Sequence, residues 1–218
     1  MYVHTCPQRA GFRVQTLESV AASDIGKSFT MICHAPGLTK QQILQWWEGE
    51  LLRLCDEAER EGQKYLLRIE DDVVVNRYIL HNVCSWPALV EPKFGMGTLF
   101  LWDLLERDVG CLARSPFTNS LYRHKHECPG SQCQLIPVAL LKLIVPEFSA
   151  MRERYWRLAR GFAMDGAPSA ALWHRGFRVY IHEPSLVDCH DRGMASAQGL
   201  VPKAPLVASS FDAEWRRA

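Results

Sequence analysis

Apolar residues in the first third of the chain follow two different spacings. Between Thr39 and Gly62 they recur at helical intervals, at Ile43, Leu44, Trp47, Leu51, Leu54, Cys55 and Ala58. Because Thr39 suits a helix N-cap and Gly62 suits a helix end, this spacing predicts one long helix. Residues 28–34 alternate as a strand does, and residues 65–69 form the short apolar run of a buried strand. The order strand, helix, strand favours a parallel α/β sheet.

The rest of the pattern predicts further elements of ordinary length. Strands are expected over residues 3–5, 97–102, 109–113 and 178–181, and helices over 12–22, 76–85, 137–145, 151–160 and 165–173. Residues 115–133 are polar and rich in turn formers, which predicts a loop. Beyond residue 196, alanine, proline and serine predominate. We therefore expect a single Rossmann-like α/β domain over residues 1–195, with a mostly parallel central sheet flanked by helices, and a C-terminal tail over 196–218.

Length and composition are those of an ordinary globular domain. The chain has 218 residues, of which 48% are hydrophobic and 22% charged, so it can bury a substantial core. A net charge of +1 gives no support to a protein held on nucleic acid mainly by phosphate contacts. The chain shows neither an apolar run of roughly 20 residues nor a signal-peptide pattern, which predicts a cytoplasmic protein. In that compartment we expect the eight cysteines to be free thiols.

Three consecutive carboxylates, Glu70, Asp71 and Asp72, come directly after the strand predicted at 65–69. Adjacent carboxylates repel one another and need a cation or hydrogen-bond donors nearby. A divalent ion meets this need, since Mg²⁺-like ions are held by one or two carboxylates together with substrate phosphates. The carboxyl end of a strand is also where open α/β sheets bind ligands. The alternative is a solvated acidic turn or a helix N-cap.

Four segments, in order along the chain, resemble the GT-A glycosyltransferases, which use nucleotide-sugars. Residues 65–73 (YLLRIEDDV) resemble the strand followed by the acidic DXD-like motif, and residues 183–193 (EPSLVDCHDRG) resemble a late PSLV element followed by a histidine. Residues 5–9 (TCPQR) resemble the loop after the first strand, and residues 165–167 (DGA) resemble the acceptor-side start of a helix. The resemblance covers about residues 1–195. It implies a GT-A fold and metal-dependent sugar transfer, with UDP-sugars favoured as donors.

The resemblance implies a metal site built on the acidic motif. Asp72 would bind Mn²⁺ or Mg²⁺, with Asp71 or Glu70 beside it contacting the ion or the donor. His190 would complete the shell as a neutral imidazole, although it has the alternative of an ordinary surface or core histidine. The ion would neutralise charge on the departing diphosphate.

The resemblance also implies contacts to the donor and to the acceptor. Arg9 lies in a loop suited to a diphosphate or nucleobase, because a guanidinium matches phosphate oxygens, and Thr5 would hydrogen-bond the nucleotide. Asp165 would act as general base toward the acceptor hydroxyl if the reaction inverts the sugar, although aspartate is also a preferred N-cap. The glycine-rich acceptor loop is reduced here to a short stretch with Gly130, Ser131 and Gln132.

The same loop carries a group of residues that zinc favours, in the pattern H-x-H-x-C-x4-C. They are His124, His126, Cys128 and Cys133. Their spacing matches no standard zinc finger. A structural zinc site and a loop over the acceptor site are therefore both open.

The residues leave the activity and the acceptor undecided. A non-catalytic nucleotide-sugar-binding module and a metal-dependent nucleotidyltransferase are alternatives, although the latter would normally show a glycine-rich phosphate loop and residues 1–20 contain only Gly11. The acceptor hydroxyl could belong to a lipopolysaccharide precursor, a protein, a small metabolite or a hydroxymethylated base in DNA. Arg114, Arg123 and Lys125 would suit DNA phosphates. The sugar, the stereochemical outcome and the oligomeric state stay open.

Overall fold

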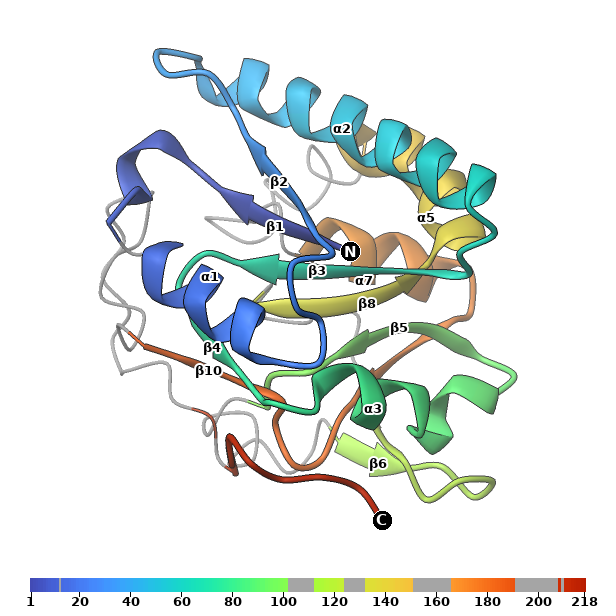
Figure 1. The fold of residues 1–218 in the computed structure, drawn as a ribbon. Helices are drawn as coiled ribbons and strands as arrows, with labels where there is room; N and C mark the ends of the chain where they lie inside the picture. The colour runs from blue at the N-terminus through green and yellow to red at the C-terminus, as the bar shows by residue number, and fades with distance from the viewer. Residues whose placement is uncertain (12, 102–111, 124–131, 151–165, 191–207, 209) are drawn as a thin grey trace.

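The computed structural model describes residues 1–11, 13–101, 112–123, 132–150, 166–190, 208 and 210–218 (Figure 1). These residues form an α/β fold around an eight-stranded sheet of order β2-β1-β3-β8-β5-β9-β7-β6. Its strands are β1 (Tyr2–Thr5), β2 (Thr30–Cys33), β3 (Tyr65–Glu70), β5 (Phe94–Thr98), β6 (Leu112–Arg114), β7 (Leu121–Arg123), β8 (Cys133–Pro137) and β9 (Arg178–Ile181).

Most strands of this sheet run in one direction. β1 pairs in parallel with β2 and β3, and β5 pairs in parallel with β9. β8 runs antiparallel to β3 and β5, and β7 runs antiparallel to β9 and β6. Six of the eight described strands therefore point the same way, with β7 and β8 as the exceptions. The expected α/β fold with a mostly parallel central sheet is confirmed.

Helices cover both faces of the sheet. The face that carries Tyr2 and Leu66 packs against α2 (Lys40–Arg60), α5 (Val138–Ile144) and α7 (Gly166–His174). The opposite face, with Val3 and Leu67, packs against α1 (Arg13–Ala22) and α3 (Ile79–Cys84) (Figure 1). Neighbouring residues enter different cores because successive strand side chains point to opposite faces. Short 3-10 helices lie at Pro7–Arg9 (η1), Pro87–Val90 (η2) and Val145–Glu147 (η4).

The long helix α2 begins and ends as its flanking residues predict. The Gln42 backbone N–H donates to the Thr39 hydroxyl at 3.3 Å, and the Thr39 backbone N–H donates to the Gln42 side chain at 2.9 Å, which forms a capping box. Gly62 follows the helix with φ of 70°, a left-handed conformation that glycine adopts without steric cost. The apolar runs also place β3 and β9 correctly.

Short strands account for most differences from the sequence-based prediction. β5 ends at Thr98, whereas the pattern predicts a strand over 97–102, and the stretch predicted as a loop contains β7. β8 is also missed, because it lies between the loop predicted over 115–133 and the helix predicted over 137–145. β4 (Val73–Val75) and β10 (Val187–Cys189) are not predicted either, and they pair antiparallel as a separate two-stranded sheet. A strand of three residues is too short to show an alternating pattern. It forms only because a distant segment pairs with it, so the local sequence does not predict it. The helix predicted over 151–160 lies outside the described residues.

The last described residues lie against α3 and the turn before it. The Asn76 side-chain amide donates to the carbonyl oxygens of Asp212 and Trp215 at 2.7 and 2.9 Å. The Asn82 amide also donates to the Trp215 carbonyl, at 3.0 Å, and both asparagines are fully buried. The predicted boundary between domain and tail, at 195/196, lies outside the described residues. Among the described helices, none combines the length and apolar character that a membrane span requires.

His182, which follows β9, is a fully buried histidine beside the rings of Trp86 and Trp215. Its Nδ1 lies 2.7 Å from the carbonyl oxygen of Pro184, and burial lowers the pKa of His182 to about 4. A histidine in the unfolded chain titrates near pH ~6.5. Between these values the unfolded chain takes up a proton that the folded chain does not. The free energy of unfolding should therefore fall as the pH falls, by about 3 kcal/mol for this group.

Urea unfolding between about pH 7.5 and pH 4.5 measures this loss, with His182→Gln as the comparison because glutamine does not titrate. The wild-type protein should lose about 2.5 kcal/mol more than the variant across the interval, because most of the proton uptake by the unfolded chain falls within it. His4, whose pKa is lowered to about 3, contributes equally to both proteins. The prediction would be contradicted if the free energy of unfolding fell equally with pH in the wild-type protein and in His182→Gln.

Candidate functional site at the β1 and β3 strand ends

The acidic motif lies where the strand order reverses. From β1 the chain passes to β2 on one side of β1 and then to β3 on the other side. In open α/β sheets such a switch point leaves a crevice at the carboxyl ends of the strands, and ligands bind there. Thr5 ends β1 and Glu70 ends β3, and the register pairs His4 with Glu70. The segments that follow the two strands therefore leave the sheet next to each other.

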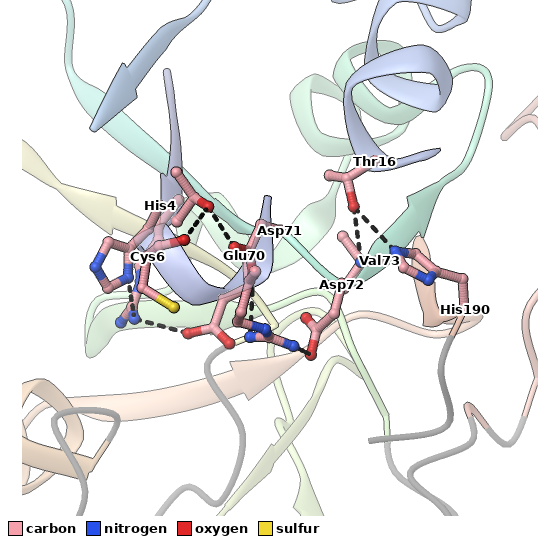
Figure 2. Close-up of polar contacts among 11 residues, drawn as sticks. His4, Cys6, Thr16, Glu70, Asp71, Asp72, Val73 and His190 are labelled. Carbon is pink, nitrogen blue, oxygen red and sulfur yellow. Dashed lines mark hydrogen bonds and ion pairs between the residues drawn. The ribbon is translucent and has the colours of Figure 1, made fainter. Parts of the chain in front are cut away.

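Side chains from the end of β1 and from the turn after it hold Asp71 and Asp72 (Figure 2). The Thr5 hydroxyl donates a hydrogen bond to Asp71 Oδ2, and Arg9 Nη1 lies 3.0 Å from Asp71 Oδ1. Arg9 Nη2 forms a hydrogen-bonded ion pair with Asp72 Oδ2. Asp71 and Asp72 are only 1% and 5% exposed, so these interactions are largely screened from water. The structure thus brings together four residues that the sequence analysis assigns to the donor and the metal.

Arg9 is presented by a tight turn. Pro7 begins the 3-10 helix η1, and within it the Arg9 backbone N–H donates to the Cys6 carbonyl oxygen at 3.1 Å. Proline suits this position because its ring fixes φ at a helical value and its missing N–H is not needed there. The turn returns the Arg9 guanidinium to the acidic motif within four residues of the end of β1.

Burial and ion pairing act in opposite directions on this cluster. Burial raises the pKa of Asp71 above its ordinary value, while the hydrogen bond from Thr5 and the charge of Arg9 act to lower it. Burial also disfavours the charge on Arg9, but Asp72 and Asp71 outweigh this effect and raise the pKa of Arg9. Arg9 therefore stays charged at physiological pH and serves as counter-ion to both carboxylates.

Glu70 belongs to a second ion pair, on the α2 face of the sheet. Arg68 Nη2 lies 2.8 Å from Glu70 Oε1 and 3.2 Å from His4 Nδ1, and its guanidinium lies 5.4 Å from the centre of the Trp47 ring. Burial and the charge of Arg68 lower the pKa of His4 to about 3, so a neutral imidazole accepts the bond. Sequence reasoning misses Arg68. The available signal is its position two residues before Glu70, which puts both side chains on one face of the strand.

The two arginines change the argument for a metal ion. The three carboxylates and the guanidiniums of Arg9 and Arg68 carry a formal charge of −3 + 2 = −1. Arginine therefore supplies much of the positive charge that the sequence analysis sought from a divalent ion. The case for a divalent ion rests instead on a substrate phosphate, which would bind the ion together with the carboxylates.

His190 lies beside the acidic motif because β10 pairs with β4. Its backbone N–H donates to the Asp72 carbonyl oxygen at 3.0 Å. Its ring is turned toward Thr16 of α1, with Nε2 3.4 Å from the Thr16 hydroxyl, and that hydroxyl accepts the Val73 N–H at 3.1 Å (Figure 2). Sequence reasoning also misses Thr16. The assignment of His190 as a metal ligand stays a prediction.

The acceptor-side residues fall mostly outside the described part of the chain. Those outside it are Asp165, Gly130, Ser131, His124, His126 and Cys128. Gln132 is buried, and its carbonyl oxygen accepts the Glu70 N–H at 2.9 Å. Cys133 is fully buried in the core, where burial raises the pKa of its thiol. The stretch assigned to the acceptor therefore meets the acidic motif at Gln132.

The described residues fit an ion shared with a phosphate rather than a closed protein cage. Among them, no group of three or more His, Cys, Asp or Glu side chains is arranged to hold a metal ion. A Mg²⁺-like ion, however, commonly takes one or two carboxylates and completes its shell with water and substrate phosphates. Asp71 and Asp72 can supply those carboxylates. Thr5 and Arg9 engage Asp71, and Arg9 engages Asp72.

By sequence, the chain matches no protein-family model and no curated protein. By structure, it matches a glycosyltransferase involved in the glycosylation of the major capsid of PBCV-1, with a TM-score of 0.44 and 12% identity over 84% of this chain and 82% of that chain. It also matches the galactosyltransferase LgtC, solved with donor and acceptor sugar analogues (TM-score 0.47, 13% identity, 83% and 72% covered). A cytidylyltransferase from Leptospira borgpetersenii matches as well (TM-score 0.41, 9% identity, 83% and 74% covered). TM-scores below 0.5 at such identities leave the activity to be argued from this chain's own residues.

Proposed function

We propose that this chain is a metal-dependent glycosyltransferase that moves a sugar from a nucleotide-sugar to a hydroxyl acceptor. The main observation in support of the proposal is that side chains from two strand ends contact one another at the switch point of the sheet. A hydroxyl at the end of β1 and a guanidinium from the turn after it contact two buried carboxylates after β3. Carboxylates suit a divalent ion, and a guanidinium suits the diphosphate that would share it.

Each residue has a distinct task in this proposal. Asp72 holds the ion, with Asp71 or Glu70 nearby, and His190 is a further ligand. Arg9 contacts the diphosphate, and Thr5 orients Asp71 through their hydrogen bond. Bound there, a divalent ion supplies positive charge against the negative charge that develops on the departing diphosphate. If the reaction inverts the sugar, Asp165 serves as general base toward the acceptor hydroxyl.

Thermal unfolding with a panel of nucleotide-sugars tests the proposal, each with MnCl₂ or with EDTA. A ligand that binds only the native state adds about 2.7 kcal/mol to its stability at 100 times the dissociation constant. We expect one nucleotide family, with UDP-sugars tried first, to raise the melting temperature in MnCl₂ and not in EDTA. The absence of any shift would remove support for this function. A shift with nucleoside triphosphates alone would favour nucleotidyl transfer instead.

A further inference from the structure

Arg9 contacts one oxygen of each of the two carboxylates that the proposed function assigns to an ion. Its Nη2 is paired with Asp72 Oδ2 and its Nη1 lies 3.0 Å from Asp71 Oδ1. With Arg9 in place the two carboxylates and the guanidinium carry a charge of −2 + 1 = −1, and without Arg9 the pair would carry −2. A divalent ion approaching Asp72 therefore competes with a cation that does not lose its charge.

Arg9 and Arg68 differ in how firmly they are held. Arg68 is 2% exposed and is tied to Glu70, to His4 and to the Trp47 ring, all within the α2 face of the sheet. The Arg9 side chain is 12% exposed and projects from a single 3-10 turn. Arg68 is therefore enclosed by its partners, whereas the Arg9 side chain keeps some contact with solvent at the edge of the site.

We propose that Arg9 is an exchangeable counter-ion that makes binding of a divalent cation depend on a nucleoside diphosphate. In the absence of a diphosphate, Arg9 holds Asp71 and Asp72 and weakens binding of the cation. A diphosphate offers the guanidinium new oxygen partners, so Arg9 releases Asp72 for the cation. The two ligands then bind with positive coupling, and each raises the affinity for the other by the same factor. This inference rests on the proposed function, because it assumes that Asp72 holds the ion beside a diphosphate.

Isothermal titration with MnCl₂ alone, with UDP alone and with both separates this role from simple phosphate binding. The variants are Arg9→Met, which removes the charge, and Arg9→Lys, which keeps it. Arg77→Met is the matched control, because Arg77 pairs with Glu214 at the surface, 59% and 65% exposed. Arg9→Met should bind Mn²⁺ alone at least about tenfold more tightly than the wild-type protein. A neighbouring arginine changes the proton affinity of a carboxylate by about tenfold or more, and we expect a comparable effect on its Mn²⁺ affinity. Arg77→Met should stay within about twofold of wild type. Arg9→Lys should lie between the wild type and Arg9→Met, because lysine keeps the charge but cannot place two nitrogens against the two carboxylates as the guanidinium does.

The coupling gives a second measurement. UDP should raise the Mn²⁺ affinity of the wild-type protein by about tenfold or more. This factor should be smaller in Arg9→Met, where only the direct contact between the ion and the diphosphate couples the two ligands. If Arg9→Met folds poorly, the gain in its melting temperature on adding MnCl₂ should exceed that of the wild type, which tests the same competition. Equal Mn²⁺ affinity in wild type and Arg9→Met, without UDP, would overturn the inference and leave the proposed function standing. Failure of both proteins to bind Mn²⁺, with or without UDP, would overturn both.

Discussion

Replacement of Asp72 by asparagine is expected to weaken Mn²⁺-dependent donor binding by about 100-fold or more. Loss of a residue that only supports a metal ligand already costs roughly 10- to 100-fold in affinity, so loss of a ligand should reach at least the upper end. Asparagine has nearly the same shape as aspartate, and Arg9 keeps Asp71 as a partner, so the fold should persist. Isothermal titration with the nucleotide-sugar that gives the largest thermal shift measures the effect, and circular dichroism checks the fold.

Two further variants define what this result means. Asp56→Asn removes an exposed carboxylate, 2.8 Å from Lys142 Nζ and remote in sequence from the motif, and should leave donor affinity unchanged. Asp165→Asn should keep donor binding and lose transfer to any acceptor that the wild-type protein uses, because the proposed base acts after the donor is bound. Wild-type affinity in Asp72→Asn would exclude this residue from the metal site.

Removal of residues 210–218 should lower the free energy of unfolding by about 4 kcal/mol. The deletion takes away the carbonyl oxygens that satisfy the buried amides of Asn76 and Asn82, and each unsatisfied buried donor costs about 1–3 kcal/mol. It also removes Trp215, which packs against the core between the sheet and α3. Urea unfolding of the full and shortened chains, analysed by linear extrapolation, measures the difference.

Point variants separate the contributions of this segment. Trp215→Ala should show part of the loss, because the Asn76 and Asn82 amides keep their backbone acceptors. Glu214→Ala should stay within about 0.5 kcal/mol of wild type, because its ion pair with Arg77 spans 3.5 Å at the surface. If the shortened chain is as stable as the full one, the packing of residues 210–218 against α3 contributes nothing.

The local pattern predicted those parts of the fold that depend on neighbouring residues. The α2 helix carries its signals within its own sequence, from the Thr39 capping box to Gly62. β3 and β9 are apolar runs buried on both faces, so their position also follows from local composition. β4, β7 and β10 have three residues each and no period of their own, so they went unpredicted.

The same division applies to the candidate site. The acidic run after a buried strand was visible as a sequence motif, and the family resemblance added Thr5, Arg9 and His190 to it. Neither source indicated Arg68 or Thr16, because each acts through contacts on a face that only the assembled sheet defines. The assignment of a metal ion to Asp72 stays a prediction, and only the structure shows that the Arg9 guanidinium contacts this carboxylate.

The sequence alone is enough to predict the acidic run, the α/β class and the helices and strands with clear local signals, because these depend on residues a few positions apart. The contacts between distant polar side chains depend on the tertiary structure. Arg9 and Asp72 are 63 positions apart, and the Thr16 and His190 side chains are 174 apart. Their contacts exist because β1 lies between β2 and β3 and because β10 pairs with β4. Strand order and long-range pairing are properties of the whole packed sheet, so no local pattern of residues specifies them.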